Sequence, residues 1–246
     1  MNSLNLIQKR PYLWDSDKKF QPTKRVAKLL GDIQDLLEQA HNYYDFAPKT
    51  SPAKGSSKDG CHRLRLLHDE LLLDYKSNRC IGTIYRSEAV LNCPTLAVGA
   101  EAEYLATHGE HVIPINLISR MIWQRNQTQK FEHETLLKFI AERACVCQIT
   151  KQEEEKLRER RNIADKHSSW TWKHPCIRTN TKEHLVYQDL DGNQIDENQT
   201  PVFARYLQSG LKIFAISDGT AQPLNFEKFT LAEHIKIAQT HYKIPQ

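Results

Sequence analysis

The chain has 246 residues, of which 39% are hydrophobic and 26% are charged, and this composition excludes a wholly disordered protein. The 34 Lys and Arg residues face 30 Asp and Glu residues, and a formal net charge of +4 is too small to indicate a nucleic-acid partner by itself. The mean hydropathy is -0.62, and no apolar run approaches the roughly 18 residues that a membrane-spanning helix needs. The length predicts one or two domains, and no membrane partner is expected.

The cysteines and the N-terminal residues indicate the compartment. The first residues lack the apolar stretch of a secretory signal, so a cytoplasmic location is expected. The six cysteines are Cys61, Cys80, Cys93, Cys145, Cys147 and Cys176, and no two of them form a CxxC pair. Reduced, buried thiols are therefore expected. A zinc site is the alternative, and its ligands would be Cys145 and Cys147 with Cys80, Cys93 or His108.

The N-terminal part of the chain is expected to contain one helix and a linker. Residues 1–20 are polar and predict an irregular arm, whereas apolar residues at spacings of three and four predict a helix over residues 22–43. Residues 47–60 are rich in Pro, Gly, Ser and Lys, as is typical of a linker or surface loop. We therefore expect an N-terminal arm, helix and flexible linker over residues 1–60, and a main α+β domain over residues 61–246.

The rest of the chain predicts helices interspersed with a few strands. Helices are expected over residues 62–76, over two stretches within 86–109, over 116–126 with Asn116 as the cap, over 133–143, over 151–162 and after Thr230. Thr150 and Glu153 form the capping box of the helix at 151. Strands are expected over residues 79–85, 144–149 and 211–217, and a β-hairpin turns at residues 189–193. The sum is an α+β fold, predominantly helical with a small mixed or antiparallel sheet.

The sharpest chemical signal lies at residues 109–115, which read Gly-Glu-His-Val-Ile-Pro-Ile. An acid followed by His, two β-branched residues and Pro resembles the first strand of the HNH, or His-Me finger, nuclease motif. In that family, a ββα unit carries a His that acts as general base on water. A divalent metal there stabilises the phosphate oxygens and the leaving group.

The resemblance implies a role for four residues. His111 would be the general base and Glu110 a metal ligand. Asn126 would be the middle Asn, and His133 would be the closing His and a second metal ligand. The implied cofactor is Mg²⁺ or Mn²⁺. The structural alternative is that His111 only precedes a buried turn.

Two further patterns carry competing interpretations. Asp74-Tyr75-Lys76, with Asp59 as the earlier acid, resembles the PD-(D/E)xK nuclease motif, in which two carboxylates hold Mg²⁺ and the Lys polarises the attacking water. The leucine spacing around this pattern predicts a helix, which favours solvated helix charges. Residues 189–193 imitate the start of a calcium loop, but Gln194 stands where such a loop needs Gly, which favours a hairpin turn.

Basic and aromatic residues alternate after the helix predicted at 151. Arg and Lys can neutralise phosphates, and Trp can stack on exposed bases. The candidate nucleic-acid-binding residues are Arg158, Arg160, Arg161, Trp170, Trp172 and Lys173.

These signals predict a metal-dependent endonuclease that acts on nucleic acid, with DNA favoured over RNA. Its size and class suit a restriction or phage-defence setting. One alternative is a non-catalytic nucleic-acid-binding or regulatory protein of a mobile element. The other is a PD-(D/E)xK-type nuclease that uses Asp59, Asp74 and Lys76.

Overall fold

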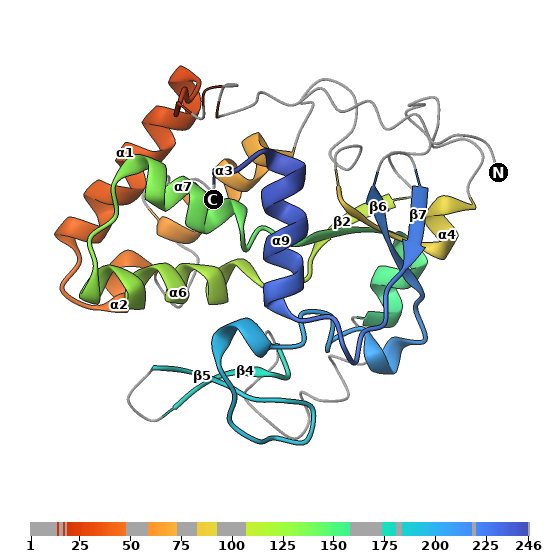
Figure 1. The fold of residues 1–246 in the computed structure, drawn as a ribbon. Coiled ribbons are helices and arrows are strands. Elements are labelled where there is room, and N and C mark those ends of the chain that lie inside the picture. Colours follow the sequence, from red (N-terminus) through yellow and green to blue (C-terminus); the bar gives the residue numbers. More distant parts are fainter. Residues whose placement is uncertain are drawn as a thin grey trace.

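A mixed five-stranded sheet forms the centre of the computed structural model (Figure 1). In spatial order, its strands are β2 (Thr107–His111), β3 (Val146–Thr150), β1 (Tyr85–Ser87), β6 (Ile213–Ser217) and β7 (Thr220–Pro223). β1 and β3 run parallel, and the other neighbours are antiparallel. The structure describes residues 14, 17, 19–47, 59–72, 83–92, 107–157, 174–180, 184–217 and 220–245, and of residues 69, 71, 72, 107, 108, 208 and 217 it describes only the backbone.

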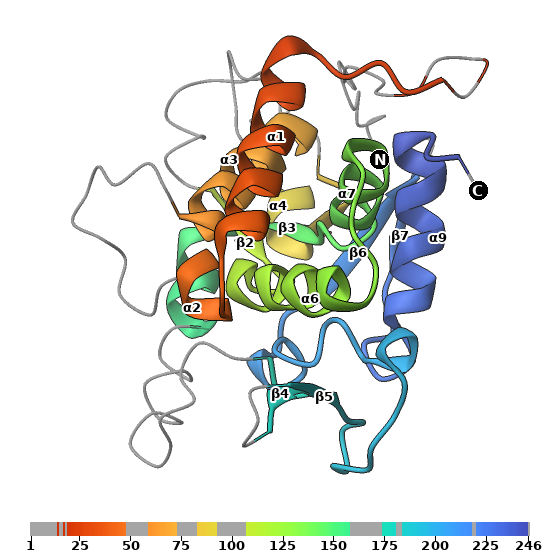
Figure 2. The same ribbon diagram turned by 90° about the vertical axis from the view of Figure 1, so that its left-hand side faces the viewer.

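Helices lie on both faces of this sheet. They are α1 (Lys24–Gln39), α2 (Tyr43–Phe46), α3 (Gly60–Leu72), α4 (Glu88–Leu91), α6 (Ile115–Thr128), α7 (His133–Ala141), a helix over residues 151–157, and α9 (Leu231–Tyr242). Figure 2 shows α9 on one side of the sheet and α1 and α3 on the other. The expected α+β fold, predominantly helical with a small mixed sheet, is confirmed.

Local capping signals place several helix ends where the sequence predicts them. The Thr23 side chain accepts a hydrogen bond from the Val26 amide at the start of α1. This helix ends at Gln39 and not near Tyr43, because Asn42 and Asp45 form a capping box that begins α2. The capping box predicted at Thr150 is present and is closed by Glu153, and the structure adds a second box at Thr230, closed by Glu233.

Three segments differ from their predictions: the strand near residue 85, the segment before residue 109 and the start of α6. The strand expected over residues 79–85 is β1 at 85–87, and the segment expected to be helical up to residue 109 is strand β2 from 107 onward. Asn116 does not cap α6, because Pro114 occupies the N-cap position and Asn116 already lies inside the helix. Proline lacks a backbone N–H, so it fits the helix start at no loss of a hydrogen bond.

A second, two-stranded sheet follows residue 174. It consists of β4 (Ile177–Thr179) and β5 (Leu185–Tyr187), which pair antiparallel. Beyond β5, Gln188 and Gln194 form a bridge around residues 189–193, with Gly192 at φ 91°. The hairpin turn expected there is confirmed, and the Asp189 side chain accepts from the amides of Asp191 and Asn193 within it. Two short 3₁₀ turns, η2 (Glu197–Gln199) and η3 (Leu207–Ser209), follow.

One hydrophobic core joins the N-terminal helix to the rest of the described chain. The apolar stripe of α1, with Leu30 and Ile33 fully buried, packs in the same cluster as Leu64 of α3 and Ile118 of α6. Trp14 is also buried there, and its indole N–H donates to Glu134 of α7 at 3.1 Å. Residues on both sides of the boundary expected at residue 60 therefore share this core.

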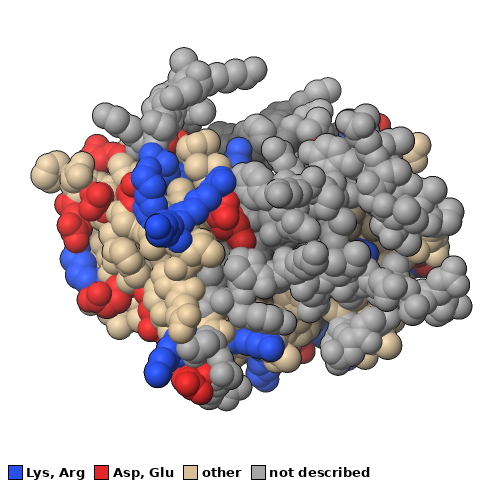
Figure 3. All heavy atoms as spheres, turned by 90° about the horizontal axis from the view of Figure 1, so that it is seen from above, with Lys and Arg blue, Asp and Glu red and all other residues tan. Residues whose placement is uncertain are grey.

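Charged side chains of both signs alternate on the outer surface of α1 and α3. Arg25 pairs with Glu70 at 2.7 Å, and Asp32 accepts from Arg63 at 3.1 Å, so ion pairs cross between the two helices. In Figure 3, Lys and Arg side chains lie among Asp and Glu side chains over the described part of this face. Within the described ranges, no helix combines the length and apolarity needed to cross a bilayer.

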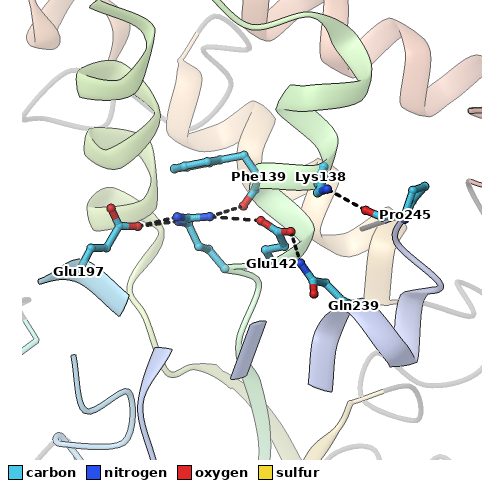
Figure 4. A network of polar contacts seen from close by, with 7 residues as sticks. Lys138, Phe139, Glu142, Glu197, Gln239 and Pro245 are labelled. Carbon is cyan, nitrogen blue, oxygen red and sulfur yellow. Dashed lines mark hydrogen bonds and ion pairs between the residues drawn. The ribbon is translucent and has the colours of Figure 1, made fainter. Parts of the chain in front are cut away.

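A buried arginine joins α7 to the C-terminal part of the chain (Figure 4). The Arg143 guanidinium donates to one carboxylate oxygen of Glu197 at 2.6 and 2.9 Å, and it lies 3.6 Å from the centre of the Phe139 ring. Glu142 lies 3.6 Å from the same guanidinium and accepts from Gln239 of α9 at 2.7 Å. These contacts hold α9 and η2 against the end of α7. Removing one partner would leave the other charge buried and uncompensated, which is destabilising.

Two fully buried histidines depend on being neutral. Tyr85 and the Nδ1 atom of His234 share a hydrogen bond of 2.7 Å, while His174 donates from Nε2 to the Val202 carbonyl and accepts at Nδ1 from the Cys176 amide. Burial, with a smaller contribution from the Arg143 charge, lowers the pKa of His234 to about 3. Burial, with Arg205 nearby, lowers the pKa of His174 to about 4.

These pKa values predict acid-sensitive stability. Below pH about 6.5 the unfolded chain binds protons that the folded chain does not, so the free energy of unfolding falls as pH decreases. Each of the two histidines contributes a loss of about 1.4 kcal/mol per pH unit between pH about 6.5 and 5. Urea unfolding measured at several pH values across this range tests the predicted pH dependence of stability. His234→Gln is expected to reduce the slope, and His184→Gln, at an exposed position, is expected to leave it unchanged. Equal slopes in all three proteins would contradict the assignment.

Candidate functional site around the end of β2

Glu110 and His111 end strand β2 and point to opposite faces of the sheet. Glu110 pairs with Cys147 on β3, and His111 pairs with Val146. Successive side chains of a strand alternate between faces, so these two neighbours do not share one. The contacts agree, because Glu110 meets Arg205 whereas His111 meets His68 of α3.

Arg205 holds the end of β2 from the Glu110 side. Its Nη2 atom lies 3.0 Å from the Glu110 carboxylate, and its Nη1 atom donates to the His111 carbonyl at 2.9 Å. Both charged side chains are largely buried, at 23% and 20% exposed. Charge-assisted hydrogen bonds are about twice as strong as neutral ones, so this pair fixes both the side chain of Glu110 and the backbone of His111.

The ring of His111 stacks on a fully buried histidine. The centroids of His68 and His111 lie 5.4 Å apart with an interplanar angle of 24°. Burial lowers the pKa of His68 well below its usual value, and the nearby His111 and Arg65 lower it further. His68 is therefore neutral at neutral pH and adds no charge beside His111. His111 itself is half-buried.

Two buried polar side chains lie on the same face of the sheet as His111. Gln148 of β3 shares the side of Val146, and Arg86 of β1 lies beside Gln148 in the parallel pair. Arg86 is 7% exposed and Gln148 is 2% exposed. Sequence reasoning missed both. The feature that could have identified Gln148 is its place as a polar residue inside the segment predicted to be a buried strand.

Asn126 and His133 lie away from this face. Asn126 follows Ile115 by eleven positions, which corresponds to about 16 Å along α6. It is buried, and its side-chain oxygen accepts from the Phe131 amide at 3.4 Å. His133 is the first residue of α7 and lies beside Gly31 of α1. The structure therefore brings neither residue to Glu110 and His111, because a continuous helix separates them.

A surface cavity of about 160 Å³ lies near that far end of α6. Its lining includes Arg125, Lys138 and Glu142, so both signs of charge face it. It belongs to the corner between α6 and α7 and not to the face that carries His111. Elsewhere in the described ranges, no three His, Cys, Asp or Glu side chains are grouped to hold a metal ion.

Asp59 of the second predicted nuclease motif has a structural role. It precedes α3, is buried, and accepts from the Cys61 amide at 2.8 Å, as a helix-capping carboxylate does. Asp74 and Lys76 lie outside the described residues. So do Cys80, Cys93 and all the candidate nucleic-acid-binding residues, Arg158, Arg160, Arg161, Trp170, Trp172 and Lys173. Cys145 and Cys147 are buried free thiols, as predicted.

The strand that carries His111 belongs to a strand–strand–helix arrangement. β2 pairs antiparallel with β3 over five residue pairs, from Thr107 with Thr150 to His111 with Val146. The helix over residues 151–157 follows β3 directly. α6 and α7 are inserted between the two strands, so the pair is contiguous in space but not in sequence.

Comparisons with known proteins give no assignment: the chain matches no family model, no curated protein and no solved structure.

The contacts of Arg205 with Glu110 and with the His111 carbonyl predict a local loss of stability when Arg205 is substituted. Arg205→Ala removes the ion pair with Glu110 and the bond to the His111 carbonyl, and it is expected to lower the free energy of unfolding by about 2 kcal/mol. Amide hydrogen exchange at the end of β2 is expected to accelerate in the same variant. Arg178→Ala, at an exposed position on β4, is the matched control. Equal free energies of unfolding and equal exchange rates in the two variants would show that Arg205 does not hold this strand.

Proposed function

We propose that the chain is an HNH-like endonuclease of the cytoplasm that hydrolyses phosphodiester bonds in nucleic acid, with His111 as the general base. The observation that supports this is the position of His111. It lies at the carboxyl end of β2, half-buried, in an antiparallel pair that leads directly into a helix. In space, although not in sequence, β2, β3 and the helix over residues 151–157 follow the strand–strand–helix arrangement of the ββα unit that the resemblance implies, with α6 and α7 inserted between the two strands.

His111 is proposed as the base because its imidazole is held in place at the end of β2. The Arg205 bond to its backbone and the stacked His68 ring hold it from two sides. A water molecule beside the ring would give its proton to the imidazole as its oxygen bonds to phosphorus. The bond from phosphorus to the leaving sugar oxygen then breaks, and that oxygen takes a proton from solvent.

The implied Mg²⁺ or Mn²⁺ has no complete ligand set among the described residues. Glu110, the proposed ligand, is paired with Arg205 and lies on the face opposite His111. Asn126 and His133 lie at the far end of α6. These residues therefore do not fit the metal together. The metal dependence remains part of the proposal as an experimental variable.

A cleavage assay with a matched histidine control tests the proposal. Purified wild-type chain is incubated with plasmid DNA and with RNA, in Mg²⁺, in Mn²⁺ and in EDTA. We expect cleavage of DNA that requires one of the metals, and a rate at least about 100-fold lower for His111→Ala. His184→Ala, at an exposed site on the hairpin, is expected to cut as wild type does.

Two outcomes would contradict this assignment. Wild-type cleavage retained by His111→Ala would exclude His111 as the base. A wild-type chain that binds nucleic acid but cuts none of it would contradict the enzyme and favour the non-catalytic binding protein. In either proposal, Arg158, Arg160, Arg161, Trp170, Trp172 and Lys173 are the residues proposed to hold the backbone or the bases.

A further inference from the structure

We propose that the cavity between α6 and α7 binds one pyrimidine nucleotide of a single strand, with the base against Phe131 and the phosphate at Arg125 and Lys138. The inference rests on nucleic acid as the proposed partner of the chain, and not on cleavage at His111.

The size of the cavity matches one six-membered ring. It measures about 160 Å³ and lies at the surface, between the last turn of α6 and the side of α7. A cavity of about 150 Å³ can hold a benzene molecule. A pyrimidine base is a single ring of that size, whereas a purine adds a second ring. We therefore expect the cavity to admit pyrimidines in preference to purines.

Two phenylalanine rings form the apolar part of the lining. Phe131 lies between α6 and α7, Phe139 lies on α7, and their ring centroids are 5.3 Å apart with an interplanar angle of 60°. Phe139 is nearly fully buried, and the Arg143 guanidinium already stacks on its ring. Phe131 is only half-buried, so its ring is the one that a base can reach. Aromatic side chains bind the bases of single strands by stacking, because every base has a π face.

Two cations line the cavity without a carboxylate partner. Among the described residues, neither Arg125 nor Lys138 makes an ion pair. Arg125 is exposed in the last turn of α6. The Lys138 ammonium donates one of its three N–H bonds to the Pro245 carbonyl at 2.7 Å, which leaves two donors (Figure 4). A guanidinium fork and an ammonium both suit phosphate oxygens.

The carboxylate in the lining, that of Glu142, is already engaged. Its Oε1 atom accepts from Gln239 at 2.7 Å, and its Oε2 atom lies 3.6 Å from Arg143 (Figure 4). Arg143 also pairs with Glu197. The two lining cations and Arg143 together face two carboxylates, so these groups keep a net positive charge, which favours an anionic ligand.

Neutral polar side chains favour a nucleotide over a simple aromatic acid. Gln129 and Thr135 both line the cavity and are both exposed. The Thr135 hydroxyl already bonds to the backbone of Glu132, so the Gln129 amide is the group available to a ligand. This amide can donate and accept, as the carbonyl and N–H groups at the edge of a pyrimidine require. An aromatic acid has no such groups along its ring.

Binding of a short single strand, measured without cleavage, tests the site. A fluorescent strand of about eight thymidines is titrated with protein in EDTA, and the anisotropy gives Kd at several salt concentrations. Arg125→Gln is expected to raise Kd at least about 5-fold and to reduce the salt slope by about 0.7, as the loss of one single-strand phosphate contact does. Phe131→Leu removes the ring and is expected to raise Kd by a similar factor, whereas Phe131→Tyr keeps the ring and is expected to bind as wild type does.

Arg178→Gln is the matched control, because Arg178 is an exposed arginine on β4 and does not line the cavity. It is expected to leave Kd unchanged. Arg125 is exposed as well, so its substitution is expected to retain the melting temperature and keeps the test decisive if Phe131→Leu does not fold. A strand of adenosines is expected to bind more weakly than the thymidine strand. Free thymidine monophosphate, titrated by calorimetry, separates a free nucleotide from one within a strand, and we expect it to bind more weakly than the strand.

The outcomes separate this inference from cleavage. If Arg125→Gln and Phe131→Leu bind the strand as tightly as wild type, or if Arg178→Gln weakens binding as much as they do, the cavity does not hold a nucleotide. Equal affinities for the thymidine and adenosine strands, or for the strand and the free nucleotide, would also contradict the inference. These results leave the His111 assay untouched. A wild-type chain that binds the strand through this cavity yet never cuts would uphold this inference and contradict the endonuclease.

Discussion

The alternation of side chains along β2 determines what the end of this strand can do. Glu110 and His111 are neighbours in sequence, but the pleat sends the carboxylate toward Arg205 and the imidazole toward His68. Glu110 therefore has a structural role, whereas His111 is the residue proposed to act chemically. Arg205 uses the carboxylate to fix the strand, and the His111 ring is left on the face that also holds Gln148 and Arg86.

Both faces of the sheet hold buried polar groups. One face is a hydrophobic core in which Tyr85 and Cys147 are fully buried. The other contains a neutral His68 and two buried polar side chains close to His111. The first face also carries Glu110, which pairs with Arg205, and His234, which bonds to Tyr85, so buried polar groups are not confined to one face.

Elements set by local signals could be predicted from the sequence. The cap at Thr23, the capping boxes at Thr150 and Thr230 and the turn at 189–193 each depend on residues a few positions apart. The strand at 144–149 could be predicted because it is a short apolar stretch interrupted only by Gln148. β2 was not readable in this way, because Gly109 and Glu110 break the alternation and its partner β3 lies beyond two helices.

The candidate site required long-range information that spacing does not carry. Asn126 and His133 fit a motif by their separation in sequence, but the straight run of α6 moves them away from His111. Arg205 contacts the same strand from 94 positions along the chain, and no local pattern connects the two. Arg86 and Gln148 meet through a parallel pairing across 62 positions, which the sequence alone does not specify.

The central claim of the proposal is that the His111 ring meets nucleic acid. Side-chain NMR of selectively labelled protein tests this most directly, on addition of a short duplex in EDTA. The account predicts shifts of the His111 ring, with the ring resonances of Tyr85 and His234 unchanged. Shifts of Tyr85 and His234 without any change at His111 would contradict it.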